Sequence, residues 1–389
     1  MTAGLDLEGF YVATIERINA QGGDKSRLGM GALMYTSHAE RPLSPDELCH
    51  ALAIELDSTH FNAGNIPSVS TLVSCCQGLI SVDKDVFGPR VRLIHFTLKE
   101  YFSTHPNIFS RPHSAMAEIC LTYLNSYQVK PLLTLSALHS RKTRRSVARP
   151  RVKSYFDTYA LDHYPFLKYC AINWGVHAKR ELSDRSRSLA LELLQGGGGH
   201  KFAQFILRQD RSLQLRRDDT LSPFSGLHCA SFLGIAKIVV ALIDMGDCDA
   251  NGEDFQGCTP LAWAARKGYE EVVIILLGRE EVDPDKPDNS GRTPLSYAAE
   301  YGSEGTVKIL LGREEVKPNN PDYSGRTPLS YAATREDEGV AKILLGQEEV
   351  NPEELDNLGR APLSHAAERG ASGGDENTTS ARGQPRPIR

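Results

Sequence analysis

The sequence Gly291-Arg-Thr-Pro-Leu295 decides the fold of this chain, because it recurs at intervals of 34 residues. The other copies are Gly257-Cys-Thr-Pro-Leu261, Gly325-Arg-Thr-Pro-Leu329 and Gly359-Arg-Ala-Pro-Leu363, and a degenerate copy, Leu227-His-Cys-Ala230, lies in register one interval earlier. A fixed interval of this length is typical of a solenoid, in which each helical unit is buried against its neighbours. The sequence therefore predicts about five repeats over residues 222–370, the last of them incomplete.

Each unit contains the signals that begin and end its helices. Thr293 can cap a helix by accepting hydrogen bonds from free backbone N–H groups, and Pro294 fits the first helical turn. Ala298 and Ala299 keep the first helix narrow, and Gly302 can close it in the left-handed conformation. The pattern Gly-x-Thr-Pro-Leu-x-x-Ala-Ala resembles the ankyrin repeat, and this resemblance implies that the region binds another protein and is not an enzyme.

The resemblance also indicates which residues would meet a partner. Helix-packing positions cannot change without creating cavities or clashes, whereas the hairpin tips and the exposed ends of the first helices are free to vary. In ankyrin relatives these positions line a concave face that contacts the partner. In this sequence they are Phe255, Gln256, Arg266, Lys267, Asn289, Arg292, Glu300, Tyr301, Tyr323, Arg326, Thr334 and Arg335.

Three of these residues, Tyr301, Tyr323 and Arg326, are the main candidates for partner affinity, because Tyr and Arg are over-represented among interface hot spots. Arg292, Arg326 and Arg360 also recur at the 34-residue interval, which predicts a basic ladder along the repeats. The alternative is that each Arg caps a helix or pairs with a nearby Asp or Glu.

The net charge of −5 conceals an acidic repeat region. Residues 241–370 contain 26 Asp and Glu against 13 Lys and Arg. This balance argues against nucleic acid as the partner, because phosphate binding needs positive charge. It is compatible with a basic protein partner, and equally with helix faces that are simply solvated.

The N-terminal half reads as helices followed by a small sheet. Residues 1–27 are expected to form one helix, whose apolar residues are Phe10, Val12, Ile15 and Ile18. A second helix is expected over residues 32–37, and another over residues 67–77.

A winged helix is predicted for residues 28–110. Ser44-Pro45-Asp46-Glu47 is a helix start with a capping box. Residues 79–82 and 91–95 read as two strands joined across Gly88-Pro89, and Thr97-Leu-Lys-Glu100 reads as a second capped helix start. With eight acidic and five basic residues between Leu28 and Ser110, this region is not expected to bind DNA.

Several segments resemble the winged helix that follows the NACHT domain in fungal receptor-like signalling NTPases of the STAND class. They are Ser37-His-Ala-Glu-Arg-Pro-Leu43, Asp46-Glu-Leu-Cys-His-Ala-Leu52 and Val91-Arg-Leu-Ile-His-Phe-Thr-Leu-Lys-Glu-Tyr101. The resemblance implies that residues 111–221 form a helical linker leading into the repeats, with a flexible basic loop at 141–153. In NACHT proteins a histidine at the position of His95 can contact bound ADP, so His95 is a cofactor contact only where such an NTPase domain is present. Otherwise it is a hydrogen-bonded histidine at a strand end.

Other motifs do not support catalysis. The segment Gly22-Gly-Asp-Lys-Ser26 lacks the glycines of a phosphate loop, and Gly370-Ala-Ser-Gly-Gly374 matches a hydrolase elbow but lies beside a polar tail, residues 371–389, that is expected to be disordered. The eight cysteines lack paired metal-ligand spacing. We therefore expect no catalytic residues, no metal, no cofactor and no small-molecule substrate. Residues 141–153 contain seven Lys and Arg and are expected to form a flexible basic loop between helices; the alternatives are a nuclear signal or an anionic contact.

The sequence thus predicts a mainly α protein with a winged-helix-like domain, a helical linker and a C-terminal ankyrin solenoid. No apolar run reaches the ~20 residues that cross a bilayer, and the N-terminus lacks a secretory signal, so the cytoplasm is the expected location, with the nucleus as the alternative. The expected function is recognition of a protein within an NLR-like receptor. The alternatives are a free-standing ankyrin scaffold or decoy, and a fragment of a larger NACHT NTPase.

Overall fold

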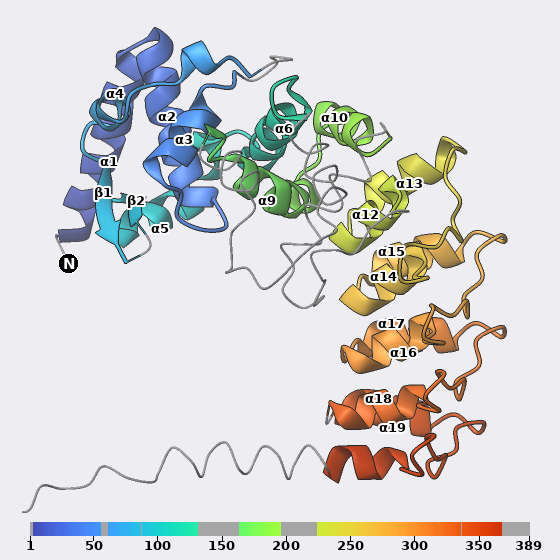
Figure 1. Ribbon diagram of the computed structural model, residues 1–389. Helices are drawn as coiled ribbons and strands as arrows, with labels where there is room; N and C mark the ends of the chain where they lie inside the picture. Colours follow the sequence, from blue (N-terminus) through green and yellow to red (C-terminus); the bar gives the residue numbers. More distant parts are fainter. Residues whose placement is uncertain are drawn as a thin grey trace, which may run out of the picture. The chain divides into compact units, whose positions relative to one another are not determined.

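The structure is a computed structural model, and it forms two units, Met1–Thr220 and Leu221–Arg389. It describes residues 3–55, 61–86, 88–130, 163–195, 224–335 and 337–367. The described residues are mostly helical and contain one two-stranded sheet (Figure 1). This confirms the predicted mainly α fold with an N-terminal winged helix and a C-terminal repeat solenoid. No helix in the described ranges is long and apolar enough to cross a bilayer.

The first unit begins with a winged helix and continues into further helices. Its elements are α1 (Ala3–Ala20), α2 (Gly23–His38), α3 (Pro45–Leu52), η1 (Ala63–Asn65), α4 (Val69–Cys75), β1 (Ile80–Asp85), β2 (Gly88–Leu93), α5 (Phe96–Thr104), η2 (Pro106–Ile108), α6 (Pro112–Asn125), α9 (Leu167–Arg180) and α10 (Asp184–Gln195).

Helix α1 buries a different face from the one predicted. Phe10 is 51% exposed and Val12 is also exposed, whereas Tyr11 and Thr14 lie in the core with the predicted Ile15 and Ile18. The spacing of apolar residues fits two overlapping faces, and packing against α2 and against Thr97 and Tyr101 of α5 selects the one that contains Tyr11.

Helix α2 is longer than the predicted 32–37. It starts at Gly23, directly after Gly22, which has a positive φ of 67°. Gly23 to Ser26 form the first turn of this helix, in which Asp24 lies near the positive end of the helix dipole.

The wing follows α3 and α4. The side chain of Ser44 accepts from the N–H of Glu47, and Glu47 accepts from the N–H of Ser44, so the predicted capping box is present. Strands β1 and β2 are antiparallel. Gly88-Pro89, predicted to join them, instead begins β2, because β1 continues to Asp85.

The rest of the first unit packs on the winged helix through aromatic side chains. Phe166, at the start of α9, contacts Tyr35 of α2 and Tyr123 of α6, with ring centroids 6.1 and 5.6 Å apart. Tyr169 stacks on Phe166 at 5.4 Å. The described part of the predicted linker therefore shares a core with α2. The predicted basic loop at 141–153 lies outside the described residues.

The second unit is a stack of helix pairs (Figure 1). The pairs are α12 (Gly226–Leu233) with α13 (Ala236–Asp244), α14 (Pro260–Lys267) with α15 (Glu270–Leu277), α16 (Pro294–Glu300) with α17 (Glu304–Leu311), and α18 (Pro328–Thr334) with α19 (Glu338–Leu345). Residues 362–367 begin a fifth first helix. Residues 368–389, which include the predicted tail and the hydrolase-like motif, lie outside the described part.

The repeat motif has a physical cause at each position. Thr293 caps α16 by accepting from the N–H of Ser296, and Thr259 and Thr327 cap their helices in the same way. Gly291 has a φ of +84°, and a Cβ there would lie 2.8 Å from the backbone N of Tyr323 in the next repeat. A larger residue would therefore strain its own backbone and push the next hairpin away.

Candidate protein-binding surface

The hairpins between repeats form a continuous backbone ladder. The N–H of Asn289 donates to the carbonyl of Gln256, and the N–H of Tyr323 donates to the carbonyl of Ser290, both at 2.9 Å. The N–H of Asn357 donates equivalently to Ser324. The hairpin tips predicted to meet a partner are thus held rigidly at a fixed spacing.

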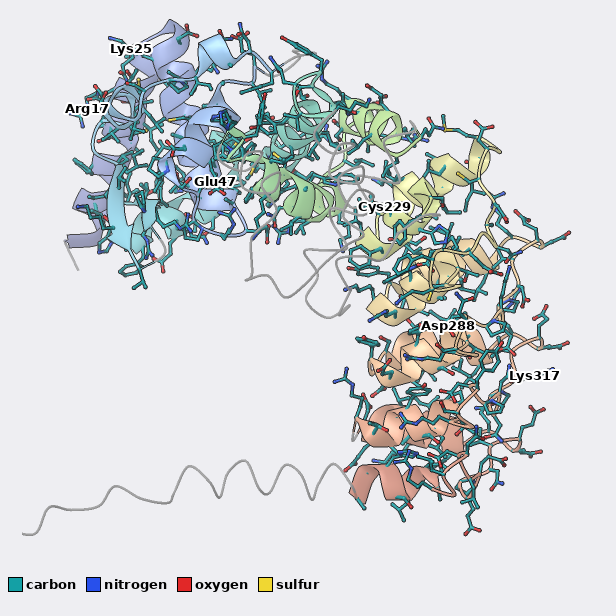
Figure 2. The ribbon with its side chains drawn as sticks, in the orientation of Figure 1. Arg17, Lys25, Glu47, Cys229, Asp288 and Lys317 are labelled. Carbon is teal, nitrogen blue, oxygen red and sulfur yellow. The ribbon has the colours of Figure 1, made fainter. Side chains whose placement is uncertain are left out.

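Each hairpin is built around a buried aspartate that the sequence analysis missed. Asp288 accepts the N–H groups of Ser290 and Arg292 through Oδ1, each at 2.8 Å, and the hydroxyl of Tyr297 through Oδ2 at 2.6 Å (Asp288 is labelled in Figure 2). Asp322 makes the equivalent three bonds, the last from Tyr331.

The same arrangement recurs in the flanking repeats. Asp254 accepts from the indole N–H of Trp263 at 2.8 Å, and Asp356 lies 3.2 Å from His365. Burial raises the pKa of Asp254 to about 6, although its hydrogen bonds act in the opposite direction. The sequence did contain a signal: an Asp followed nine residues later by an aromatic side chain, repeated every 34 residues.

Arginines are inserted between the aromatic rings of successive repeats. The Arg266 guanidinium lies 5.3 Å from the Trp263 ring, 5.6 Å from Tyr297 and 5.2 Å from Tyr301, and it donates to the Tyr301 hydroxyl at 2.8 Å. Arg335 approaches the other side, 5.5 Å from the Tyr301 ring. Contacts of this kind hold neighbouring first helices together by cation–π attraction.

The predicted basic ladder divides into three different environments. Arg292 lies between the rings of Tyr297 and Tyr331, at 4.1 and 4.5 Å, and forms an ion pair with Glu300. Arg360 forms an ion pair with Asp356 at 2.9 Å. The side chain of Arg326 has no ion pair within the described ranges. Two of the three arginines therefore follow the alternative interpretation, pairing with an acid.

The difference between Arg292 and Arg326 follows from one position. The residue eight places after Arg292 is Glu300, and the residue eight places after Arg326 is Thr334. Burial would lower the pKa of Arg292, but Tyr297, Tyr331 and Glu300 together raise it, so Arg292 stays charged. The Arg326 backbone N–H donates to Asp322 at 2.9 Å, and no ion pair of its side chain is found within the described ranges.

In the structure, all twelve predicted binding residues are at least partly exposed to solvent. Tyr323, at a hairpin tip, is 72% exposed. Asn289 and Arg335 are also exposed, and the remaining nine are half-buried: Phe255, Gln256, Arg266, Lys267, Arg292, Glu300, Tyr301, Arg326 and Thr334. Lys267 contacts the ring of Phe232 at 4.6 Å, which extends the surface to the first repeat. We call these twelve residues the hairpin face.

His95 lies far along the chain from this surface and has a local role. Its side chain accepts from the N–H of Thr97 and caps α5. The predicted capping box starting at Thr97 is therefore wrong, because the helix begins two residues earlier than that prediction required. The imidazole is exposed and also bonds the Thr97 hydroxyl at 2.7 Å.

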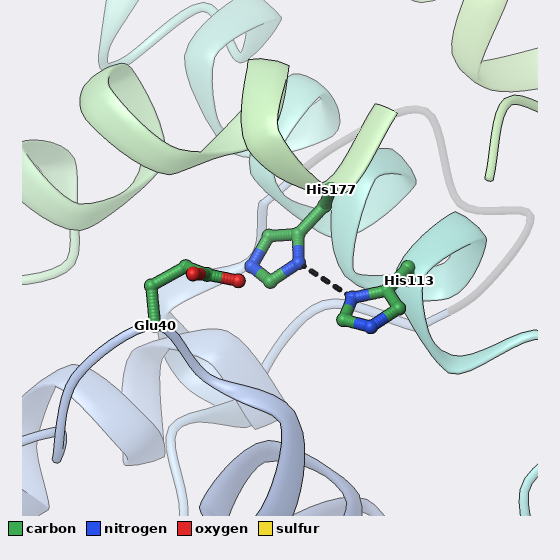
Figure 3. Close-up of side chains that lie close together, drawn as sticks. All are labelled: Glu40, His113 and His177. Carbon is green, nitrogen blue, oxygen red and sulfur yellow. Dashed lines mark hydrogen bonds between the residues drawn. The ribbon is translucent and has the colours of Figure 1, made fainter. Parts of the chain in front are cut away.

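One group of described residues has side chains that a metal ion can use. Glu40, His113 and His177 each offer an atom within 4.8 Å of the other two (Figure 3). The two Nδ1 atoms already share a hydrogen bond of 2.9 Å, His177 Nε2 bonds the Tyr169 hydroxyl at 2.8 Å, and Glu40 forms an ion pair with Arg180. A cation would have to replace the shared proton and compete with Arg180. The arrangement is that of a hydrogen-bonded network joining α6, α9 and the segment after α2.

Comparisons with known families agree with this architecture. Ankyrin repeats are found in three overlapping copies, at residues 195–288, 227–322 and 264–353. Residues 17–111 match a family described as GPI inositol-deacylase, winged helix domain. A search of curated proteins finds no significant match. The chain therefore combines a winged helix domain of the GPI inositol-deacylase type with C-terminal ankyrin repeats, which are protein-interaction modules.

Proposed function

We propose that the hairpin face binds a protein partner and that Tyr323 and Arg326 make the principal contacts. The observation that carries this proposal is the exposure of Tyr323, at 72%, on a hairpin whose backbone is fixed to both neighbours. A large aromatic side chain on a rigid frame loses little conformational entropy on binding, so its burial contributes efficiently to affinity.

Arg326 strengthens the argument because it lies on the same hairpin. It is half-buried and has no ion pair within the described ranges. Tyr301 has a different role, because its hydroxyl accepts from Arg266 and its ring contacts Arg335. We therefore expect Tyr301 to contribute less to affinity than Tyr323, and to position the cations around it.

The test is to select binders on the full chain from a display library and to compare their affinity for two variants. The first replaces Tyr301, Tyr323 and Arg326 with Ala. The second, the control, replaces three exposed glutamates of the second-helix side with Ala: Glu280, Glu281 and Glu314. The first variant should lose at least tenfold in affinity, about 1.4 kcal/mol, with an unchanged melting temperature. Unchanged binding by a folded first variant would move the site elsewhere.

We further propose that the module is the recognition part of a signalling receptor of the NACHT type, acting in the cytoplasm or nucleus. The order of a winged helix followed by ankyrin repeats supports this context. A free-standing scaffold and a decoy share the same modules. Sequencing the full transcript separates these readings, because a phosphate loop encoded upstream would favour the receptor and its absence would favour the scaffold or decoy.

A further inference from the structure

The charges of the repeat unit are sorted by structural element. Ten exposed glutamates lie on the second helices or in the turns that follow them: Glu270, Glu271, Glu280, Glu281, Glu304, Glu314, Glu315, Glu338, Glu348 and Glu349. The same elements contain five cations, Lys237, Arg279, Lys308, Arg313 and Lys342. Part of the acidic balance of the region therefore lies on the second-helix side.

The hairpin face has the opposite charge. Of its twelve residues, five are cationic and only Glu300 is anionic. The aspartates beneath it, such as Asp288, are buried and occupied by backbone N–H groups and tyrosine hydroxyls. A ligand that approaches the hairpin face therefore meets positive charge, although the repeat region as a whole is negative.

The arginines of this face retain donors for a ligand. Stacking on aromatic rings uses the faces of the guanidinium groups and leaves their charge intact. The Nε atoms of Arg266 and Arg292 are buried among the described residues, so Arg326 and Arg335 are the arginines that supply donors for a ligand. Arg326 has no ion pair there, and Arg335 is exposed. Guanidinium donors that are already held in place bind carboxylates with a small loss of side-chain freedom.

We propose that the hairpin face recognises an acidic segment of its partner, lying in an extended conformation along the repeats. This inference rests on the proposed function and names its ligand class. It differs from the basic partner with which the net charge of the region is compatible, because that charge is summed over the whole region and ignores its distribution over the elements.

The geometry also sets a spacing for the acidic residues. Arg292 and Arg326 occupy equivalent positions in adjacent repeats. Packed helices lie about 8–10 Å apart, and a chain in the extended polyproline II conformation rises about 3.1 Å per residue with three residues per turn. Carboxylates three residues apart on the partner would therefore match successive repeats.

The experiment is an unbiased selection of 16-residue peptides, displayed on phage, against the full chain. Recovered peptides are then measured against two charge-reversed variants. One carries Arg326→Glu and Arg335→Glu, and the matched control carries Lys308→Glu and Lys342→Glu on the second helices. We expect net-negative peptides enriched in acids at positions i and i+3. We also expect about tenfold weaker binding or more by the first variant, and less than about twofold change by the control.

The outcomes separate the two proposals. If the selected peptides are neutral or basic but still fail to bind the first variant, the proposal of an acidic ligand is wrong. The proposal that the hairpin face binds a protein would then stand. Peptides unaffected by the first variant, or affected equally by both variants, would overturn both proposals, as would a selection that enriches no peptide. Thermal melting of each variant establishes that it is folded, and an Arg326→Gln, Arg335→Gln variant supplies a second measurement if the reversed one does not fold.

Discussion

Replacing Asp288 with alanine should lower the free energy of unfolding of the repeat unit by about 3 kcal/mol. The carboxylate is buried and accepts three hydrogen bonds, from the N–H groups of Ser290 and Arg292 and from the hydroxyl of Tyr297. Each bond to a charged group contributes about 1.5–3 kcal/mol. The net loss is smaller than their sum, because alanine also removes the cost of burying the charge.

The assay is urea denaturation followed by tryptophan fluorescence. The chain has two tryptophans, Trp174 in the first unit and Trp263 in the second. In a Trp174→Phe background, the signal from Trp263 reports on the repeats. The midpoint for Asp288→Ala should fall well below that of the parent.

Two variants calibrate this result. Tyr297→Phe removes one of the three bonds to Asp288 and should cost about 1 kcal/mol. Glu314→Ala, on the exposed side of the next turn, should stay within about 0.5 kcal/mol of the parent. A loss of less than 1 kcal/mol for Asp288→Ala would refute the idea that the aspartate organises the hairpin.

Three further predictions concern the last repeat, the histidine network and nucleotide binding. Ala361→Thr should stabilise the repeats by about 1 kcal/mol in urea, because the new hydroxyl can accept from the N–H of Ser364 as Thr293 does for Ser296; no gain would show that the cap does not form. Burial lowers the pKa of His177 to about 3, so the unfolded state binds more protons between pH 3 and 6.5, and the first unit should lose about 1.4 kcal/mol of stability at pH 5.5 relative to pH 8. Trp174 fluorescence measures this loss, and a His177→Gln variant with the same pH slope would contradict it. Finally, equilibrium dialysis should detect no stoichiometric ATP binding at micromolar concentration, since none of the motifs forms a complete phosphate loop.

Helix caps could be predicted from the sequence because the hydrogen bonds that form them join residues only a few positions apart. The Ser44 capping box and the Thr293 cap join groups three residues apart, so the sequence contains both partners. The face of α1 was wrong for a related reason. Tyr11 fits the core because its hydroxyl reaches Thr97, 86 residues later, and no local pattern contains that bond.

The sequence located the residues of the hairpin face but did not show which side chains they contact. The 34-residue interval located Arg292, yet its environment depends on Tyr331, which comes from the next repeat. The pairing of Asp288 with Tyr297 was visible as a repeated spacing of nine residues, but only the burial of the hairpin shows why both residues are needed. Contacts between repeats decide which side chains hold the hairpins together and which side chains are open to a ligand.

The most direct test of the binding face is site-specific photo-crosslinking. Benzoylphenylalanine is placed at position 323, on the hairpin tip, or at position 308, on an exposed second-helix position, and each protein is irradiated with a ligand recovered by selection on the unmodified chain. The proposed function predicts a covalent product from position 323 and none from position 308. A product from position 308 with none from position 323 would contradict it.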